Sequence, residues 1–203
     1  SSIGEDMELI VRLHLHHRRS GRPYRIVFLA DPVCWTEAPE SLKVLKNQRT
    51  RWQRGLLESL WLNRALLLHP RGGAVGWLAF PAMLVFEAFG PLIELLGYAS
   101  MLLGGLTGLI SWPVCAAFLV LAIGLGLLLS TSALLLEEMS FHIYPDLSHL
   151  LQLTAAMLIE NLGYRQLVMW WRMQGTVKWL AGRPSEWGDM RRSASWQVPK
   201  ERP

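Results

Sequence analysis

The chain contains one long apolar stretch, residues 74–136, which reads AVGWLAFPAMLVFEAFGPLIELLGYASMLLGGLTGLISWPVCAAFLVLAIGLGLLLSTSALLL. Its sixty-three residues include only two charged side chains, Glu87 and Glu94. An α-helix needs about 20 apolar residues to cross the hydrocarbon core of a bilayer. The stretch is therefore long enough for more than one span, and it predicts an α-helical membrane protein.

Glycine and proline interrupt this stretch and predict where its spans begin and end. The interruptions are Gly90-Pro91, Gly104-Gly105 and Ser111-Trp112-Pro113. They favour two long spans, over about 75–98 and 113–136, and leave room for a third between them. A shorter apolar stretch, residues 147–162, is expected either to span or to lie in the interface. The total is between two and four spans.

Basic residues lie on both sides of the apolar stretch and give the chain a net charge of +4. They cluster in residues 12–25, 46–71 and 165–202. Because basic segments stay on the cytosolic side of a membrane, we expect the N-terminal part and the tail to be cytosolic. No nucleic-acid recognition motif accompanies the charge, so we expect no nucleic-acid partner.

The part that precedes the apolar stretch is predicted to contain two helices and a short strand. Apolar residues at helical spacing predict a helix over residues 6–19, which residues 20–23 then break. Residues 25–30 (RIVFLA) are rich in β-branched and aromatic side chains and predict a strand. Apolar residues at three- and four-residue steps predict a second helix from residue 41 to about 68.

The second helix carries a polar motif, Gln48-Arg49-Thr50-Arg51-Trp52, of the pattern QxxRW. Residues three and four apart are neighbours on a helix surface. Gln48, Arg51 and Trp52 are therefore expected on one face. Arg49 lies one position round the helix but meets Trp52 at i+3. The motif should gather guanidinium, amide and indole groups in one place.

The acidic element Gly4-Glu5-Asp6 precedes this motif, with Asp6 forty-two residues before Gln48, and the apolar stretch follows the motif. The order resembles the end of the catalytic domain in membrane-integrated family 2 glycosyltransferases, a group that includes cellulose, chitin, hyaluronan and poly-N-acetylglucosamine synthases. The resemblance implies a mostly α chain, in which the C-terminal edge of an α/β (GT-A-like) domain precedes a helical transmembrane region. It implies cytosolic residues 1–70, transmembrane or interfacial helices in 71–172 and a basic cytosolic tail in 173–203.

The resemblance also implies a role for each motif residue. Asp6 would be the catalytic base that takes the proton of the attacking hydroxyl. Arg49 and Arg51 would approach the diphosphate. Substrate-binding roles are implied for Glu5, Gln48, Arg49, Arg51 and Trp52, with Trp52 stacking on the acceptor sugar. Without the combined motif, Asp6 would be interpreted as a helix cap and the arginines as solvated charges.

The substrates follow from the same resemblance. They are a nucleotide-sugar donor and a glycan or lipid-linked acceptor, joined with inversion at the inner or plasma membrane of a bacterial cell, in contact with the lipid bilayer. A divalent metal, Mg or Mn, is expected, with its aspartate ligands before Ser1, so residues 1–203 alone are expected to be inactive. Two alternatives remain open: a non-processive transferase, and a non-catalytic membrane component of a secretion or transport assembly.

Two further groups of polar residues receive predictions. Glu87 and Glu94 are two helical turns apart, so they predict a protein-facing polar strip within the first span, beside a glycan passage or in an interhelical contact. His14, His16 and His17 have no acidic or cysteine partner nearby, and a solvated helix end is favoured over a metal site.

Overall fold

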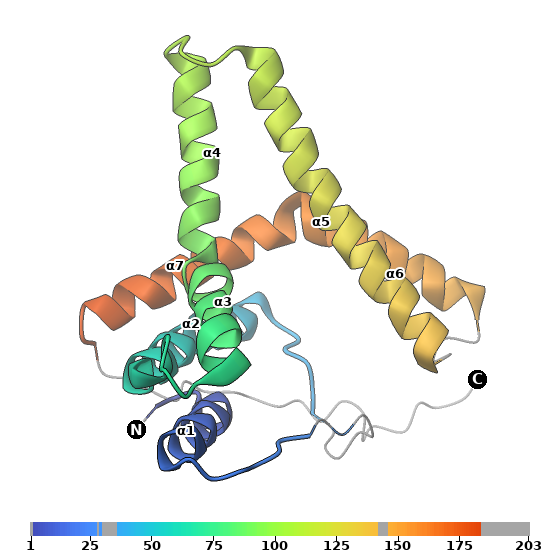
Figure 1. Ribbon diagram of the computed structural model, residues 1–203. Coiled ribbons are helices and arrows are strands. Elements are labelled where there is room, and N and C mark those ends of the chain that lie inside the picture. Colours follow the sequence, from blue (N-terminus) through green and yellow to red (C-terminus); the bar gives the residue numbers. More distant parts are fainter. Residues whose placement is uncertain (1, 28, 30–35, 142–145, 184–203) are drawn as a thin grey trace. The chain divides into compact units, whose positions relative to one another are not determined.

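A computed structural model of the chain describes residues 2–27, 29, 36–141 and 146–183. Within these residues every regular element is helical (Figure 1). The elements are α1 (Glu5–Ser20), α2 (Leu42–Leu62), η1 (Arg64–Leu66), η2 (Val75–Ala79), α3 (Phe80–Ala82), η3 (Met83–Ala88), α4 (Gly90–Leu106), α5 (Trp112–Phe141), α6 (Leu147–Ile159), η4 (Glu160–Tyr164) and α7 (Arg165–Leu180). The prediction of a mostly α chain is confirmed.

The strand expected at residues 25–30 is not observed. Residues 25–27 and 29 have no regular structure, and residues 28 and 30 lie outside the described part. A strand needs a neighbouring strand to pair its backbone N–H and C=O groups. No described residue supplies such a neighbour, so the prediction of an α/β domain edge finds no sheet here.

The chain divides into two compact units. The first contains the residues up to Phe89 together with those from Trp171 onward, and the second contains residues 90–170. The first unit therefore holds α1 to η3 and the second half of α7. This division concerns packing alone, and the predicted boundaries between cytosol, membrane and tail stay predictions.

The first unit is built on a core that α2 supplies in large part. Its buried hydrophobic residues are Val11, Leu56, Leu57, Leu60, Leu66, Phe80 and Ala88. Met7 and Leu15 of α1 and Trp179 of α7 pack against this cluster. Burying an aliphatic side chain of this size stabilises a fold by about 1.5–3 kcal/mol. The core therefore fixes α1 on α2, which is the arrangement on which the candidate site depends.

The ends of α2 are set by polar side chains. Ser41 caps the start, where its Oγ accepts a hydrogen bond from the Val44 N–H at 3.3 Å. The helix ends at Leu62, six residues earlier than the sequence predicts. At this end the Ser59 carbonyl accepts both the backbone N–H of Asn63, at 3.1 Å, and its buried side-chain Nδ2, at 3.0 Å.

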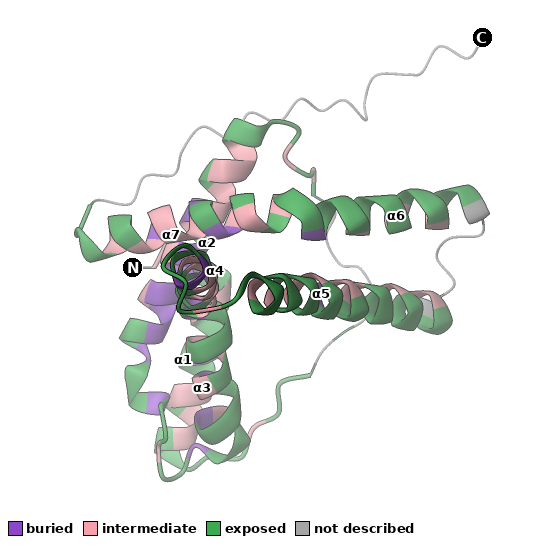
Figure 2. Ribbon diagram, turned by 90° about the horizontal axis from the view of Figure 1, so that it is seen from above, coloured by how far each residue is buried: buried purple, intermediate pink, exposed green. Residues whose placement is uncertain are grey.

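The second unit contains the longest helix, α5. Its segment Trp112–Ser140 is apolar and long enough to cross a membrane, and the predicted span over about 113–136 lies within it. Figure 2 shows exposed positions along most of α5 and α6. The span predicted over about 75–98 is interrupted at Phe89. Val75–Ala88 and Gly90–Leu106 are together long and apolar enough to cross a membrane, but only as a broken pair of helical segments.

Candidate active site

The QxxRW motif lies on α2 about two to three turns from its start, and its residues differ in exposure. Thr50 is buried, whereas Gln48, Arg49 and Arg51 are half-buried. The side chain of Trp52 is exposed to 50%. The motif thus has one residue directed into the unit and an indole that remains accessible to a ligand.

Arg49 and Trp52 contact each other as their spacing predicts. The guanidinium carbon of Arg49 lies 4.7 Å from the centroid of the Trp52 ring. A guanidinium over an indole face is attracted by the ring electrons and holds both groups in place. The Nε of Arg49 is buried and forms no hydrogen bond with the described residues. Stacking on Trp52 therefore orders the Arg49 side chain.

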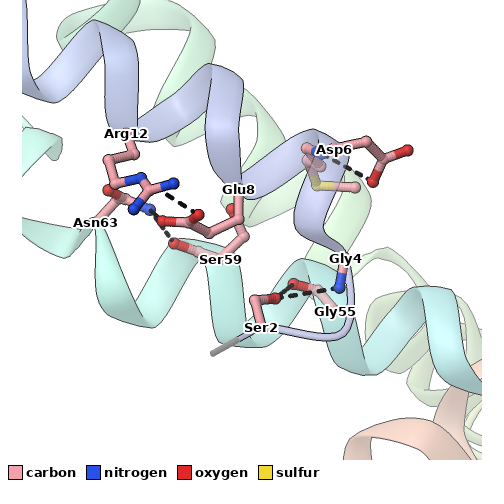
Figure 3. A network of polar contacts seen from close by, with 9 residues as sticks. Ser2, Gly4, Asp6, Glu8, Arg12, Gly55, Ser59 and Asn63 are labelled. Carbon is pink, nitrogen blue, oxygen red and sulfur yellow. Dashed lines mark hydrogen bonds and ion pairs between the residues drawn. The ribbon is translucent and has the colours of Figure 1, made fainter. Parts of the chain in front are cut away.

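Glu5 and Asp6 lie in the first turn of α1, and both are exposed. The Oδ1 of Asp6 accepts a hydrogen bond from the Met7 N–H at 2.8 Å. Negative side chains in a first turn are stabilised by the free N–H groups of the helix. In Figure 3 the carboxylate of Asp6 points away from Glu8, Ser59 and Asn63. The Asp6 carboxylate is therefore accessible to solvent.

Gly4 and Gly55 join the two motifs through their backbones. A Cβ atom on Gly4 would lie 3.2 Å from the Cα of Gly55, and one on Gly55 would lie 2.8 Å from the N of Gly4. At Gly55 the added Cβ would collide with the backbone, so only a hydrogen side chain permits this approach there. Ser2 adds a hydrogen bond from its Oγ to the Gly55 carbonyl at 3.4 Å, and the Ile3 N–H donates to Glu58 Oε2 at 3.0 Å.

Further along the two helices, Glu8 fixes α1 on α2 a second time. Its Oε1 accepts a hydrogen bond from Asn63 Nδ2 at 3.4 Å, and its Oε2 pairs with Arg12 Nε at 3.4 Å. Figure 3 shows this group beside Ser59 on the same side of α2. Two contacts one after the other along the helices fix their register, so Asp6 has a defined position relative to Gly55.

The structure therefore brings the Asp6 turn close to the end of the QxxRW motif. Gly55 follows Trp52 by three residues, which is a rise of about 4.5 Å along α2. The sequence did not identify Gly4, Gly55, Glu8 or Asn63 as positioning residues. A glycine inside an otherwise helical pattern is a signal for close approach of another backbone, and Gly55 carries that signal.

The described residues contain no group of three or more His, Cys, Asp or Glu side chains that could hold a metal ion. The divalent metal that the resemblance implies, with its ligands before Ser1, stays a prediction.

The two carboxylates of the apolar stretch do not lie on one uninterrupted helix. Glu87 belongs to the first unit, where its Oε2 lies 3.5 Å from Arg172 Nη2. Glu94 belongs to the second unit, where its Oε1 lies 3.3 Å from Arg165 Nε. The prediction of a single strip is corrected, because the break at Phe89 separates the residues and each carboxylate has its own arginine.

The histidines near the end of α1 form a cluster around Tyr24. His14 Nδ1 lies 2.6 Å from the Tyr24 hydroxyl, and the ring of His17 stacks on the Tyr24 ring at 4.9 Å. Arg18 Nε donates to the same hydroxyl at 3.1 Å. Burial in the first place, and then the charges of Arg18 and His17, lower the pKa of His14 below its ordinary value. His16 and the last two residues of α1 are exposed, as a solvated helix end predicts, whereas His14 and His17 are half-buried beside Tyr24.

The sequence of residues 1–136 matches the model of a protein family described as "Glycosyl transferase family group 2". This is about two thirds of the 203 residues. No solved structure matches the chain. The family match favours an enzyme over the non-catalytic membrane component that the sequence left open.

Proposed function

Because this chain belongs to glycosyl transferase family group 2, we propose that it transfers a sugar, with inversion, from a nucleotide-sugar donor to a glycan or lipid-linked acceptor at a membrane. Polysaccharide synthesis is the process that this activity would serve. Sugar transfer in general follows from the family. The membrane setting, the inversion and the roles of single residues are parts of the proposal.

The reaction needs a base, and Asp6 is the proposed one. The acceptor hydroxyl attacks the anomeric carbon of the donor and forms the new glycosidic bond. The bond from that carbon to the diphosphate oxygen breaks, and the diphosphate leaves with its electron pair. The proton of the hydroxyl passes to the Asp6 carboxylate. The exposure of this carboxylate at the start of α1 supports the role.

Charge on the leaving diphosphate needs positive partners. Arg49 and Arg51 are the proposed ones, because a guanidinium offers several donors in a plane that matches phosphate oxygens. Gln48 and Glu5 would add hydrogen bonds to donor or acceptor. Trp52 is proposed to stack on the acceptor sugar with its accessible indole face.

The observation that carries the proposal is the backbone contact between Gly4 and Gly55. It fixes the turn that carries Asp6 beside the helical turn that follows Trp52. A base and a set of phosphate-binding arginines act together only when they are held at one place. The contact between Gly4 and Gly55 supports the proposal, because it packs the start of α1 against the turn of α2 that follows the motif.

The proposed membrane setting rests on α5. Its segment Trp112–Ser140 exceeds the length that a bilayer core requires, and the basic clusters on both sides of the apolar stretch favour a cytosolic position for the catalytic residues. We propose the inner or plasma membrane of a bacterial cell.

The test compares two carboxylate variants in membranes from cells that produce the complete protein. Asp6→Asn keeps the shape of the side chain and removes its basicity, so turnover should fall about 10²-fold or more. Asp146→Asn alters another exposed carboxylate, at the start of α6, and should retain wild-type turnover. Release of nucleoside diphosphate from labelled donor is the measurement. Near wild-type turnover of Asp6→Asn would refute the proposed base.

A further inference from the structure

α7 contacts α2 directly at the QxxRW motif. A Cβ atom on Gly175 would lie 2.6 Å from the Thr50 carbonyl oxygen and 3.1 Å from the Cβ of Gln53. The Thr50 Oγ1 donates a hydrogen bond to the Trp171 carbonyl at 3.3 Å, and this bond is buried. The backbone of α7 therefore lies against the central residue of the motif, at a distance that only glycine allows.

Gln53, the residue after the motif, is the centre of a buried polar network. Its side chain is exposed to only 2%. Its Nε2 donates to the Ala88 carbonyl at 3.0 Å and to Thr176 Oγ1 at 3.3 Å. Its Oε1 accepts a hydrogen bond from Arg172 Nε at 2.8 Å. A buried amide is costly unless its donors and its acceptor are paired, and these contacts pair them all.

Arg172 extends the network to a third element. Its Nη2 donates to the Glu87 carbonyl and lies 3.5 Å from Glu87 Oε2. One guanidinium thus binds the side chain of Gln53 on α2 and the backbone at the end of η3. Because the fork of a guanidinium is planar and rigid, it fixes the distance between these two partners.

The contacts with α7 lie on a different side of α2 from the stacked pair of the motif. Thr50 and Gln53 are three residues apart and face α7. Arg49 and Trp52 have the same spacing, one residue earlier, so they are rotated from the first pair by about 100°. Any rotation of α2 about its own axis would break the bonds of Thr50 and Gln53 and would also turn Arg49 and Trp52 away from their site.

We infer that Arg172 is a positioning residue, which acts through Gln53 to fix the rotation of α2 and thereby the direction in which the QxxRW motif faces its substrates. This role rests on the function proposed above. Arg172 itself need not contact donor or acceptor. Since the whole helix is positioned, loss of Arg172 should impair donor and acceptor engagement together.

The experiment is a double-mutant cycle on Arg172 and Gln53, with kcat and KM for both substrates measured in membranes that contain the complete protein. Arg172→Met should lower kcat/KM about 10-fold or more, because small displacements of positioned groups have effects of this size. Arg172→Lys keeps one charged donor and should restore part of the loss. Gln53→Leu combined with Arg172→Met removes both partners and should be no worse than Arg172→Met alone.

Arg165→Met is the matched control, since it removes an ion pair that the same helix makes with Glu94 in the second unit. It should keep the wild-type KM values. A milder variant, Thr176→Val, removes one acceptor of the Gln53 amide at nearly constant volume, and it covers the case in which Arg172→Met fails to fold. Unfolding midpoints of all variants establish that the assays compare folded proteins.

Three results would overturn the inference. The first is wild-type kinetics in Arg172→Met or in folded Thr176→Val, and the second is an equal loss of kcat/KM in Arg165→Met. The third is a double variant whose loss of kcat/KM equals the product of the losses in the Arg172 and Gln53 single variants. Failure of the underlying function has a separate signature, because Asp6→Asn would then retain turnover whatever Arg172→Met does.

Discussion

Gly4 and Gly55 place the backbones of α1 and α2 in direct contact, with a Cβ on Gly55 falling 2.8 Å from the Gly4 nitrogen. Glycine inside a helix costs about 1 kcal/mol relative to alanine. Gly55 lies in the middle of α2, so its presence there weakens the helix. The absence of a side chain at Gly55 is what allows the turn that carries Asp6 to approach α2 so closely.

Gly55→Ala should destabilise the protein in spite of the better helix propensity of alanine. The added methyl group meets backbone atoms that cannot move without displacing α1, and such overpacking costs about 1–3 kcal/mol. We expect a lower unfolding midpoint and reduced sugar transfer. Gly124→Ala is the control, because a Cβ there has no neighbour within 4 Å. An unchanged midpoint in Gly55→Ala would show that α1 moves freely on α2.

The helices of the first unit are predictable from local patterns. The apolar spacing of α1 and α2 and the break at Gly21, which adopts φ +66° at the end of α1, are properties of short segments. The Arg49–Trp52 contact also follows from spacing on one helix. In each of these cases the partners lie within a few residues, so the sequence determines the geometry.

Contacts between distant segments were not predictable in the same way. Arg172 contacts Gln53 across 119 residues of sequence, and Glu8 contacts Asn63 across 55. No periodicity identifies such partners, because they depend on how helices pack. Asn63, which follows the early end of α2 at Leu62, is engaged both by its own helix and by α1.

Arg51→Lys should weaken the donor side of the reaction. Lysine keeps the charge but loses the planar fork that matches two phosphate oxygens. A charge-assisted hydrogen bond contributes about 1.5–3 kcal/mol, so we expect the KM for the nucleotide sugar to rise about 10-fold or more. Competition by the free nucleoside diphosphate measures the same effect without turnover. Wild-type competition would exclude Arg51 from the diphosphate site.

Trp52→Ala should weaken the acceptor side and leave donor binding nearly unchanged. The side chain is half-exposed, so its removal leaves no large cavity. We expect a higher KM for the acceptor, with the KM for the nucleotide sugar within about twofold of wild type. Trp52→Phe retains a ring for stacking and should recover much of the loss. Equal losses of donor affinity in Trp52→Ala and Arg51→Lys would contradict separate roles.

Acidification should loosen the cluster around Tyr24. The pKa of His14 is lowered by burial and by Arg18 and His17, so the folded state binds the proton less well than the unfolded state does. The stability that neutral His14 contributes is present above its unfolded pKa of about 6.5. It is lost as the pH falls below that value toward the lowered pKa.

His14→Gln tests this pH dependence, because glutamine can still bond to the Tyr24 hydroxyl but does not titrate in this range. The wild-type protein should lose unfolding free energy more steeply than His14→Gln between pH 7 and pH 5. Denaturant unfolding at several pH values measures the two slopes. Parallel slopes would mean that His14 is not the group responsible.

The Glu94–Arg165 pair provides a measurement of the proposed membrane setting. The two side chains lie 3.3 Å apart, and the Tyr98 hydroxyl donates to the same Glu94 oxygen at 3.1 Å. Both charged residues line a cavity of about 340 Å³ in the second unit. The pair is partly exposed, with 49% of the Arg165 side chain and 20% of the Glu94 side chain accessible. Its strength therefore depends on whether water or lipid fills the surroundings.

Glu94→Gln, Arg165→Gln and the double variant form a cycle whose coupling energy distinguishes the two settings. In water a partly exposed pair contributes at most about 1 kcal/mol. Next to hydrocarbon, an unpaired charge costs about 2.5–3.5 kcal/mol, so each single variant should be destabilised by a similar amount and the double variant by much less. We expect the larger coupling when unfolding is measured in lipid nanodiscs. A coupling below about 1 kcal/mol there, as for a pair in water, would place this pair away from lipid and would count against a span formed by this part of the chain.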